Sequence, residues 1–137
     1  MDKIFIALNI IIDYIDSTKK LDEAEITNQL IDIGFGDHEI RQAMSIFEIQ
    51  NFSGNPIYRT FTKKESSRLS NETMLFIQKL YLYGILEAEL IEESIEKAIE
   101  SSQNKVSIEN FKNALLFTLL EARNLYFEQF ETEEDFS

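Results

Sequence analysis

The sequence predicts a mainly all-α fold, a compact bundle of about six helices with a short extended or β-prone segment near residues 57–61. Three observations support this prediction. Apolar residues recur at spacings of three and four through most of the chain, as they do on one face of a helix. Helix-capping residues and isolated glycines stand where these segments begin and end. The 137 residues are 44% hydrophobic, which is enough for one domain with its own core.

We expect three helices in the N-terminal part, residues 3–49. The first is apolar around most of its circumference, so it lies centrally in the core or against a partner. Asp22 is placed to cap the second helix, and Glu25 follows at the spacing of a capping box. Gly34 suits the left-handed residue that ends this helix, and Asp37 is expected to cap the third.

An insert at residues 50–61 interrupts the helical spacing. It holds the single proline of the chain, Pro56, directly after Gly54 and Asn55, a combination typical of a turn. Residues 57–61 then alternate between side chains that favour strands, so we expect a short extended segment or strand there. No second segment is evident that would pair with it, which keeps the prediction mainly helical.

The remaining helices are expected in the second half of the chain. Thr62 and Glu65 form a capping box that opens a short helical turn, and Ser70 is placed to cap the helix after it. The last helix, from Ser107, is apolar on nearly all sides at its centre, so we expect it to lie between other helices. The expected division is a single helical domain over residues 1–127, made of 3–49, 50–61 and 62–127, followed by an acidic tail over 128–137.

The order of these features is that of a known family. It runs through Ile57-Tyr58, the Thr62–Glu65 turn, a helix through Leu75 and Ile77, the Gly84-Ile85-Leu86 break, Ile95 and Ala98, and Val106 to Leu116. In order and spacing the chain resembles the Smg family, small acidic bacterial proteins of unknown function. The N-terminal helix and the Gly34-Phe35 turn match as well. The resemblance implies no catalytic residues, and it implies an association with DNA metabolism through the family's gene neighbours.

The composition excludes most enzyme chemistries. Twenty-five acidic residues face 13 basic ones, a net charge of −12, and an acidic surface repels phosphates and so disfavours nucleic acid as a partner. The absence of cysteine removes disulfides, thiolate metal sites and cysteine nucleophiles. A single histidine, His38, leaves little scope for a catalytic triad or a histidine metal site. We therefore expect a protein that is not an enzyme and that holds no cofactor or metal.

An apolar run near the N-terminus, from Ile4 to Ile12, is the one feature that resembles a membrane segment. Its nine residues are too few to cross a bilayer, which takes about 20. Acidic residues precede and follow the run, unlike the pattern of a secretory signal. We expect a cytoplasmic protein without membrane contact.

The acidic tail is the first candidate for partner binding. Phe130 and Phe136 lie among Glu133, Glu134 and Asp135, and no cation separates them. Like charges keep such a segment extended and hydrated, while exposed phenylalanines favour capture by a groove. We expect a protein–protein interaction module whose partner is unidentified, and a DNA-handling protein with a basic surface is the first class to consider. A frayed helix end with a solubilising tip is the competing interpretation.

A small basic and aromatic cluster is the alternative site. It consists of Tyr58, Arg59, Lys63, Lys64 and Arg68. Cations beside aromatic rings bind single-stranded nucleic acid by charge and stacking, so a weak nucleic-acid-binding accessory protein is the second hypothesis. The same cluster also suits an acidic patch on a protein. Four cations release few counterions, which argues against strong nucleic-acid binding.

A third hypothesis places a metal or an acid–base pair on an acidic helix at residues 87–101. Carboxylates recur there at Glu89, Glu93, Glu96 and Glu100. Paired carboxylates hold divalent cations or divide acid and base roles when burial separates their pKa values. A solvated helix face is the favoured interpretation, because no histidine lies close in sequence to complete a metal set.

Overall fold

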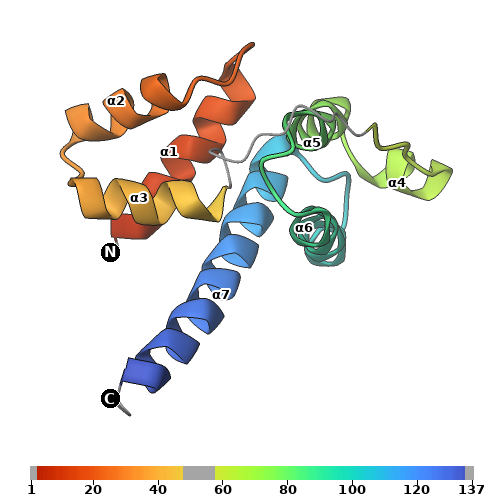
Figure 1. The fold of residues 1–137 in the computed structure, drawn as a ribbon. Coiled ribbons are helices and arrows are strands. Elements are labelled where there is room, and N and C mark those ends of the chain that lie inside the picture. The colour runs from red at the N-terminus through yellow and green to blue at the C-terminus, as the bar shows by residue number, and fades with distance from the viewer. Residues whose placement is uncertain (1–2, 48–57, 135–137) are drawn as a thin grey trace.

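In a computed structural model, the described residues form seven α-helices and no strand (Figure 1). The structure describes the backbone of residues 3–47 and 58–134, and side chains as far as Ala122. The helices are α1 Lys3–Ser17, α2 Glu23–Ile33, α3 Asp37–Ile46, α4 Lys63–Arg68, α5 Asn71–Tyr83, α6 Ala88–Ser101 and α7 Ile108–Glu134. The prediction of a mainly all-α bundle is confirmed.

The segment that was expected to be extended or β-prone forms no strand in its described part. Residues 58–62 have no regular secondary structure, and residue 57 lies outside the described residues. One isolated parallel bridge instead joins Leu69 to Val106. The Val106 amide donates to the Arg68 carbonyl at 2.7 Å, and the Ser70 amide donates to the Val106 carbonyl at 3.1 Å.

Helix α1 lies centrally, as its apolar circumference predicts. It packs against α2, α3, α5 and α7, and Leu8, Ile11 and Ile12 are fully buried. Ile6 is the apolar residue that faces outward among its polar ones. Figure 1 shows α1, α2 and α3 grouped on one side of α7, with α5 and α6 on the other.

Helix α7 joins the two groups of helices. It packs against α6, α1 and α5, and Phe111, Leu115 and Leu119 are fully buried between them. At 27 residues the helix is about 40 Å long. Its C-terminal turns extend beyond the other described helices (Figure 1).

Most helix ends follow the predicted capping residues. Thr62 and Glu65 form the predicted capping box, with the Glu65 amide donating to Thr62 Oγ1 at 3.1 Å and the Thr62 amide donating to Glu65 Oε1 at 3.0 Å. The Ser70 hydroxyl accepts from the Thr73 amide at 3.1 Å. Asp22 caps α2 by accepting from the amide of Ala24 at 3.0 Å.

Two predicted caps are wrong in detail. Glu25 does not complete a box with Asp22, because its carboxylate accepts from the Tyr14 hydroxyl at 3.1 Å instead. Asp37 does not cap α3, because the helix already begins at that residue and Gly36 is the capping position. The Glu39 carboxylate accepts from the Gly36 amide at 2.9 Å, which satisfies a donor at this helix start.

Gly34 ends α2 in the left-handed conformation, as predicted, with φ of 115°. The Phe35 amide donates to the Leu30 carbonyl at 3.1 Å, which closes the turn. We expect Gly34→Ala to lower the free energy of unfolding by about 1 kcal/mol, because a Cβ is strained at this φ even where space is open. Gly36→Ala is the matched control: its φ is −82°, so we expect a change within about 0.5 kcal/mol. Urea denaturation measures both, and equal losses would contradict this account.

None of the helices in the described part of the chain is long and apolar enough to cross a membrane.

Candidate functional site

Arg59, a member of the predicted basic cluster, is bound by two carboxylates. Its guanidinium donates to Glu65 Oε2 at 2.6 Å and to both carboxylate oxygens of Glu92, with Nε at 2.6 Å from Oε2 and Nη2 at 2.8 Å from Oε1. The guanidinium carbon lies 4.8 Å from the centre of the Phe61 ring, at cation–π distance. The Tyr81 hydroxyl donates to Glu92 Oε2. We call Arg59, Glu65, Glu92 and Tyr81 the Arg59 network.

The network shifts the ionisation of its members toward the paired forms. Hydrogen bonds from Arg59 hold the pKa of Glu65 and the pKa of Glu92 below their usual range. The hydrogen bond to Glu92 raises the pKa of Arg59 further above its already high value. Burial, together with the bond to Glu92, raises the pKa of Tyr81 to about 12. All four groups therefore keep one charge state at neutral pH.

Arg68 is the second cluster member with a structural contact. Its guanidinium donates to the carbonyl of Ile99 at 3.1 Å and to the carbonyl of Ser102 at 2.6 Å. These carbonyls belong to the C-terminal end of α6, where a cation offsets both the unpaired acceptors and the helix dipole. Arg68 thus joins α4 to α6, and its charge is partly used within the fold.

The exposed members of the cluster are Tyr58, Lys63 and Lys64. All three side chains are exposed, and Tyr58 is 75% exposed. Lys63 and Lys64 stand on the first turn of α4. Only Lys64 and Arg68 of the five residues line the shallow hollow of about 450 Å³ between α4 and α6, so no single cleft brings the cluster together. The structure therefore leaves two lysines and one tyrosine for external contact at this site.

Glu92 is the partner of Arg59 that the sequence did not identify. It lies 33 residues from Arg59. In the sequence of its helix it resembles the other exposed glutamates. No local pattern signals such a pair, because the two residues meet only when the segment before α4 packs beside α6. Glu65 was recognised as a capping residue, but its second role toward Arg59 was not.

The prediction of an extended acidic tail is wrong as far as Glu134, because α7 continues to that residue. The side chains of Phe130, Glu133 and Glu134 lie outside the described ones, and Asp135 and Phe136 lie outside the described residues altogether. In sequence, the spacing that buries Phe111, Leu115 and Leu119 continues through Ala122, Tyr126 and Phe130. The apolar periodicity of α7 therefore persists into turns that extend beyond the other helices (Figure 1).

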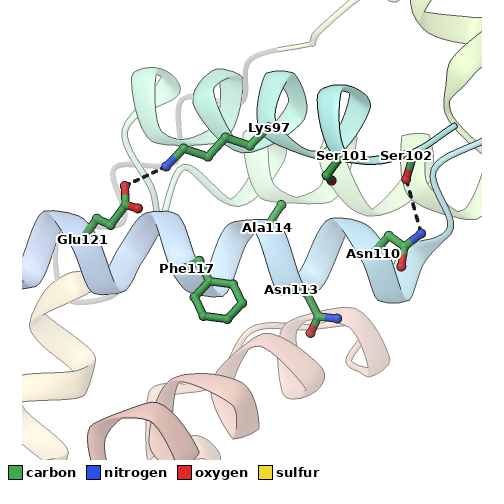
Figure 2. A pocket seen from close by; sticks show the side chains of 8 residues that line it. All are labelled: Lys97, Ser101, Ser102, Asn110, Asn113, Ala114, Phe117 and Glu121. Atoms are coloured by element: carbon green, nitrogen blue, oxygen red, sulfur yellow. Dashed lines mark hydrogen bonds and ion pairs between the residues drawn. The ribbon is translucent and has the colours of Figure 1, made fainter.

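A shallow cleft of about 410 Å³ lies between α6 and α7. Figure 2 shows Lys97 of α6 reaching Glu121 of α7 at one end, and Asn110 meeting Ser102 at the other. The Lys97 ammonium lies 2.7 Å from Glu121 Oε2 and 3.3 Å from Glu93 Oε1. We call the space lined by Lys97, Ser101, Ser102, Asn110, Asn113, Ala114, Phe117 and Glu121 the α6–α7 cleft.

Phe117 is the large apolar residue of the α6–α7 cleft that stays in contact with water. It is 56% exposed, although Leu115, Leu116 and Leu119 on the same helix are buried. Its ring meets Phe5 of α1 edge-on, with the ring centroids 6.4 Å apart. The sequence analysis counted Phe117 within the apolar centre of the last helix and did not single it out. Its exposure depends on where α6 and α1 leave α7 uncovered.

The remaining sequence candidates stand apart from one another. His38 is exposed on the first turn of α3. Glu89, Glu93, Glu96 and Glu100 lie on the exposed side of α6, and only Glu93 of these four pairs with Lys97. Within the part of the chain that the structure describes, no three histidine or carboxylate side chains gather as metal ligands would.

These features define the class of protein: a small acidic helical domain with a long final helix. The chain matches the family described as "Protein of unknown function (DUF494)" over residues 6–134, and it belongs to that family. A relative from Methylococcus capsulatus named Protein Smg homolog is 27% identical over 110 residues, which cover 76% of this chain and 71% of the relative. The resemblance to the Smg family is confirmed. No solved structure matches the chain.

Proposed function

We propose that this protein is a non-enzymatic interaction module of the cytoplasm, and that it binds another protein through the projecting end of α7. The observation that carries the proposal is the continued apolar spacing of α7, through Tyr126 and Phe130, in turns that extend beyond the other helices. A helix face of this kind is a common docking element, since an amphipathic helix lays its apolar side into a partner's groove.

The charge of the projecting end favours a basic partner. Residues 128–137 hold five carboxylates and no cation. Opposite charge steers two proteins together and raises their rate of association. A basic surface is typical of proteins that handle DNA, because such a surface neutralises phosphates. A DNA-handling protein is therefore the partner class that we propose first.

Deleting residues 128–137 tests the proposal. We expect the deletion to leave the thermal midpoint of unfolding nearly unchanged, because Phe111, Leu115 and Leu119 form the buried part of α7. Partner recovered on the tagged protein from its native cells should fall by about tenfold or more, the loss of roughly one strong contact. Quantitative mass spectrometry, with and without nuclease, measures the recovery.

Matched single substitutions separate the apolar contribution from the charge. Phe130→Ala should weaken capture while Leu75→Ala, at an exposed leucine on α5, should not. Replacing Glu133 and Glu134 by glutamine should make capture weaker, whereas the same change at Glu96 and Glu100 should have little effect. If the deletion variant captured the partner as well as the parent protein does, the end of α7 would not be the binding surface.

The nucleic-acid alternative depends on the exposed Tyr58, Lys63 and Lys64, because Arg59 and Arg68 are engaged within the fold. It requires partners that disappear with nuclease and with charge reversal of both lysines. Partners that survive nuclease support the protein-binding function instead.

A further inference from the structure

We propose that the α6–α7 cleft is a docking groove for a basic amphipathic helix of a partner protein. The inference rests on the proposed function, since it assigns a second contact surface on the same helix that carries the projecting end. Phe117 provides the apolar anchor, and the carboxylates beside the cleft select the charge of the helix that enters.

The apolar part of the argument begins with Phe117. It is 56% exposed, and Ala114 lies one turn before it with a side chain that points toward α6 (Figure 2). Phe5 of α1 is half-buried beside the Phe117 ring. An aromatic ring on a rigid, deeply packed helix loses little entropy when a partner covers it, which is the property of a strong interface anchor.

The charge around the cleft is negative. Its single cation, Lys97, is already within ion-pair distance of Glu93 and Glu121, so that set alone carries one excess negative charge. Of the other exposed carboxylates on α6, Glu96 and Glu100 line the separate hollow between α4 and α6, so Glu93 and Glu121 are the carboxylates that border this cleft. A partner helix with lysine or arginine on its flanks gains attraction along this border, whereas an acidic helix, or a second copy of this chain with its charge of −12, is repelled.

The polar lining fits the sides of a helix rather than a small anion. Ser101 and Ser102 end α6, while Asn110 and Asn113 face the cleft from α7. Hydroxyl and amide groups accept and donate equally well, so they accommodate the polar flank of an amphipathic helix. The shallow, open form of the space also suits a surface helix that lies along α7 better than an enclosed ligand.

Two synthetic peptides test the proposal with the full-length chain. One is an amphipathic helix of leucine and lysine of roughly 18 residues, about five turns, and the other replaces each lysine by glutamate. We expect the lysine peptide to bind at least about tenfold more tightly, a difference of about 1.4 kcal/mol. In spectra of isotope-labelled protein, the amide signals of Ser101, Asn110 and Asn113 should move during its titration. Shifts spread evenly over the molecule, or equal affinity for both peptides, would overturn the proposal.

Substitutions in the cleft provide the matched comparison. Phe117→Ser should weaken binding of the lysine peptide about tenfold, whereas Leu75→Ser, at a leucine that is 72% exposed on α5, should change it less than about twofold. Ser101→Arg keeps Phe117 in place but adds bulk and a cation, and it should weaken binding as well. Equal affinities for the Phe117, Ser101 and Leu75 variants would overturn the proposal.

Phe130→Ala, measured alongside, distinguishes this inference from the proposed function. It should leave peptide binding in the cleft unchanged and reduce capture of the native partner. If peptide binding depended on Phe130 and not on Phe117, the docking surface would be the end of α7. That result would overturn the proposal for the cleft and leave the proposed function standing.

Discussion

Replacing Phe111 by alanine is expected to lower the free energy of unfolding by about 4 kcal/mol, the largest effect that we predict for a single substitution in this chain. Phe111 is fully buried where α7 meets α5. Its ring packs edge-on against Phe76, with the centroids 5.9 Å apart and the planes at 75°. Truncation removes the aromatic contact and leaves a cavity that the rigid helices around it fill only in part.

Urea denaturation followed by circular dichroism measures this loss. Phe111→Leu keeps most of the volume, so it should cost less than about 2 kcal/mol. Phe117→Ala, on the same helix but largely exposed, should cost less than about 1 kcal/mol. If the Phe111 and Phe117 variants lost the same stability, Phe111 would not lie in the core that the structure describes.

The predictions that succeeded depend on residues close together in the chain. Thr62 with Glu65, and Ser70 with Thr73, meet across three residues, so their hydrogen bonds follow from helix geometry alone. The left-handed glycine at Gly34 follows in the same way from the absence of a side chain. The prediction of the cap is wrong at α3, where Gly36 and Asp37 are adjacent candidates. The Glu39 carboxylate accepts from the Gly36 amide, and Gly36 is the capping position.

The choice of buried face depends on neighbours that the sequence does not display. The spacing of Met74, Ile77 and Tyr81, with Leu80 as a further candidate, predicts the inward side of α5. The structure buries Ile77, Leu80 and Tyr81 there, leaves Met74 half-buried and adds Phe76. Phe76 points inward because Phe111 of α7 lies opposite, and the pairing of helices far apart in the chain decides that contact.

The candidate sites show the same division. The exposed lysines of α4 and the carboxylates of α6 were recognised from composition and spacing. The Arg59 network was not recognised, because it joins the segment before α4 and α4 itself to the end of α5 and the first half of α6. Arg59, which the sequence analysis treated as available for a ligand, is bound within the fold. A substitution of Arg59 is therefore expected to change stability and not ligand binding.

Arg59→Met is expected to lower the free energy of unfolding by about 2 kcal/mol near neutral pH. The side chain of Arg59 is 13% exposed, and those of Glu65 and Glu92 are 20% and 46% exposed. Removing one member of a fully buried ion pair costs more than this, but water screens the Glu92 side of the network. Lys63→Met, at an exposed lysine on α4, is the matched control and should change stability by less than about 0.5 kcal/mol.

The pH dependence identifies the ionic part of this loss. Arg59 lowers the pKa of both Glu65 and Glu92 in the folded chain. Their contribution is therefore fully present above the ordinary glutamate pKa of about 4.3 and is lost as the pH falls through the lowered folded values. The difference in stability between the parent and Arg59→Met should shrink over that window. A difference that stays constant down to about pH 3 would instead assign the stabilisation to packing of the arginine on Phe61, since that contact does not require an ionised carboxylate.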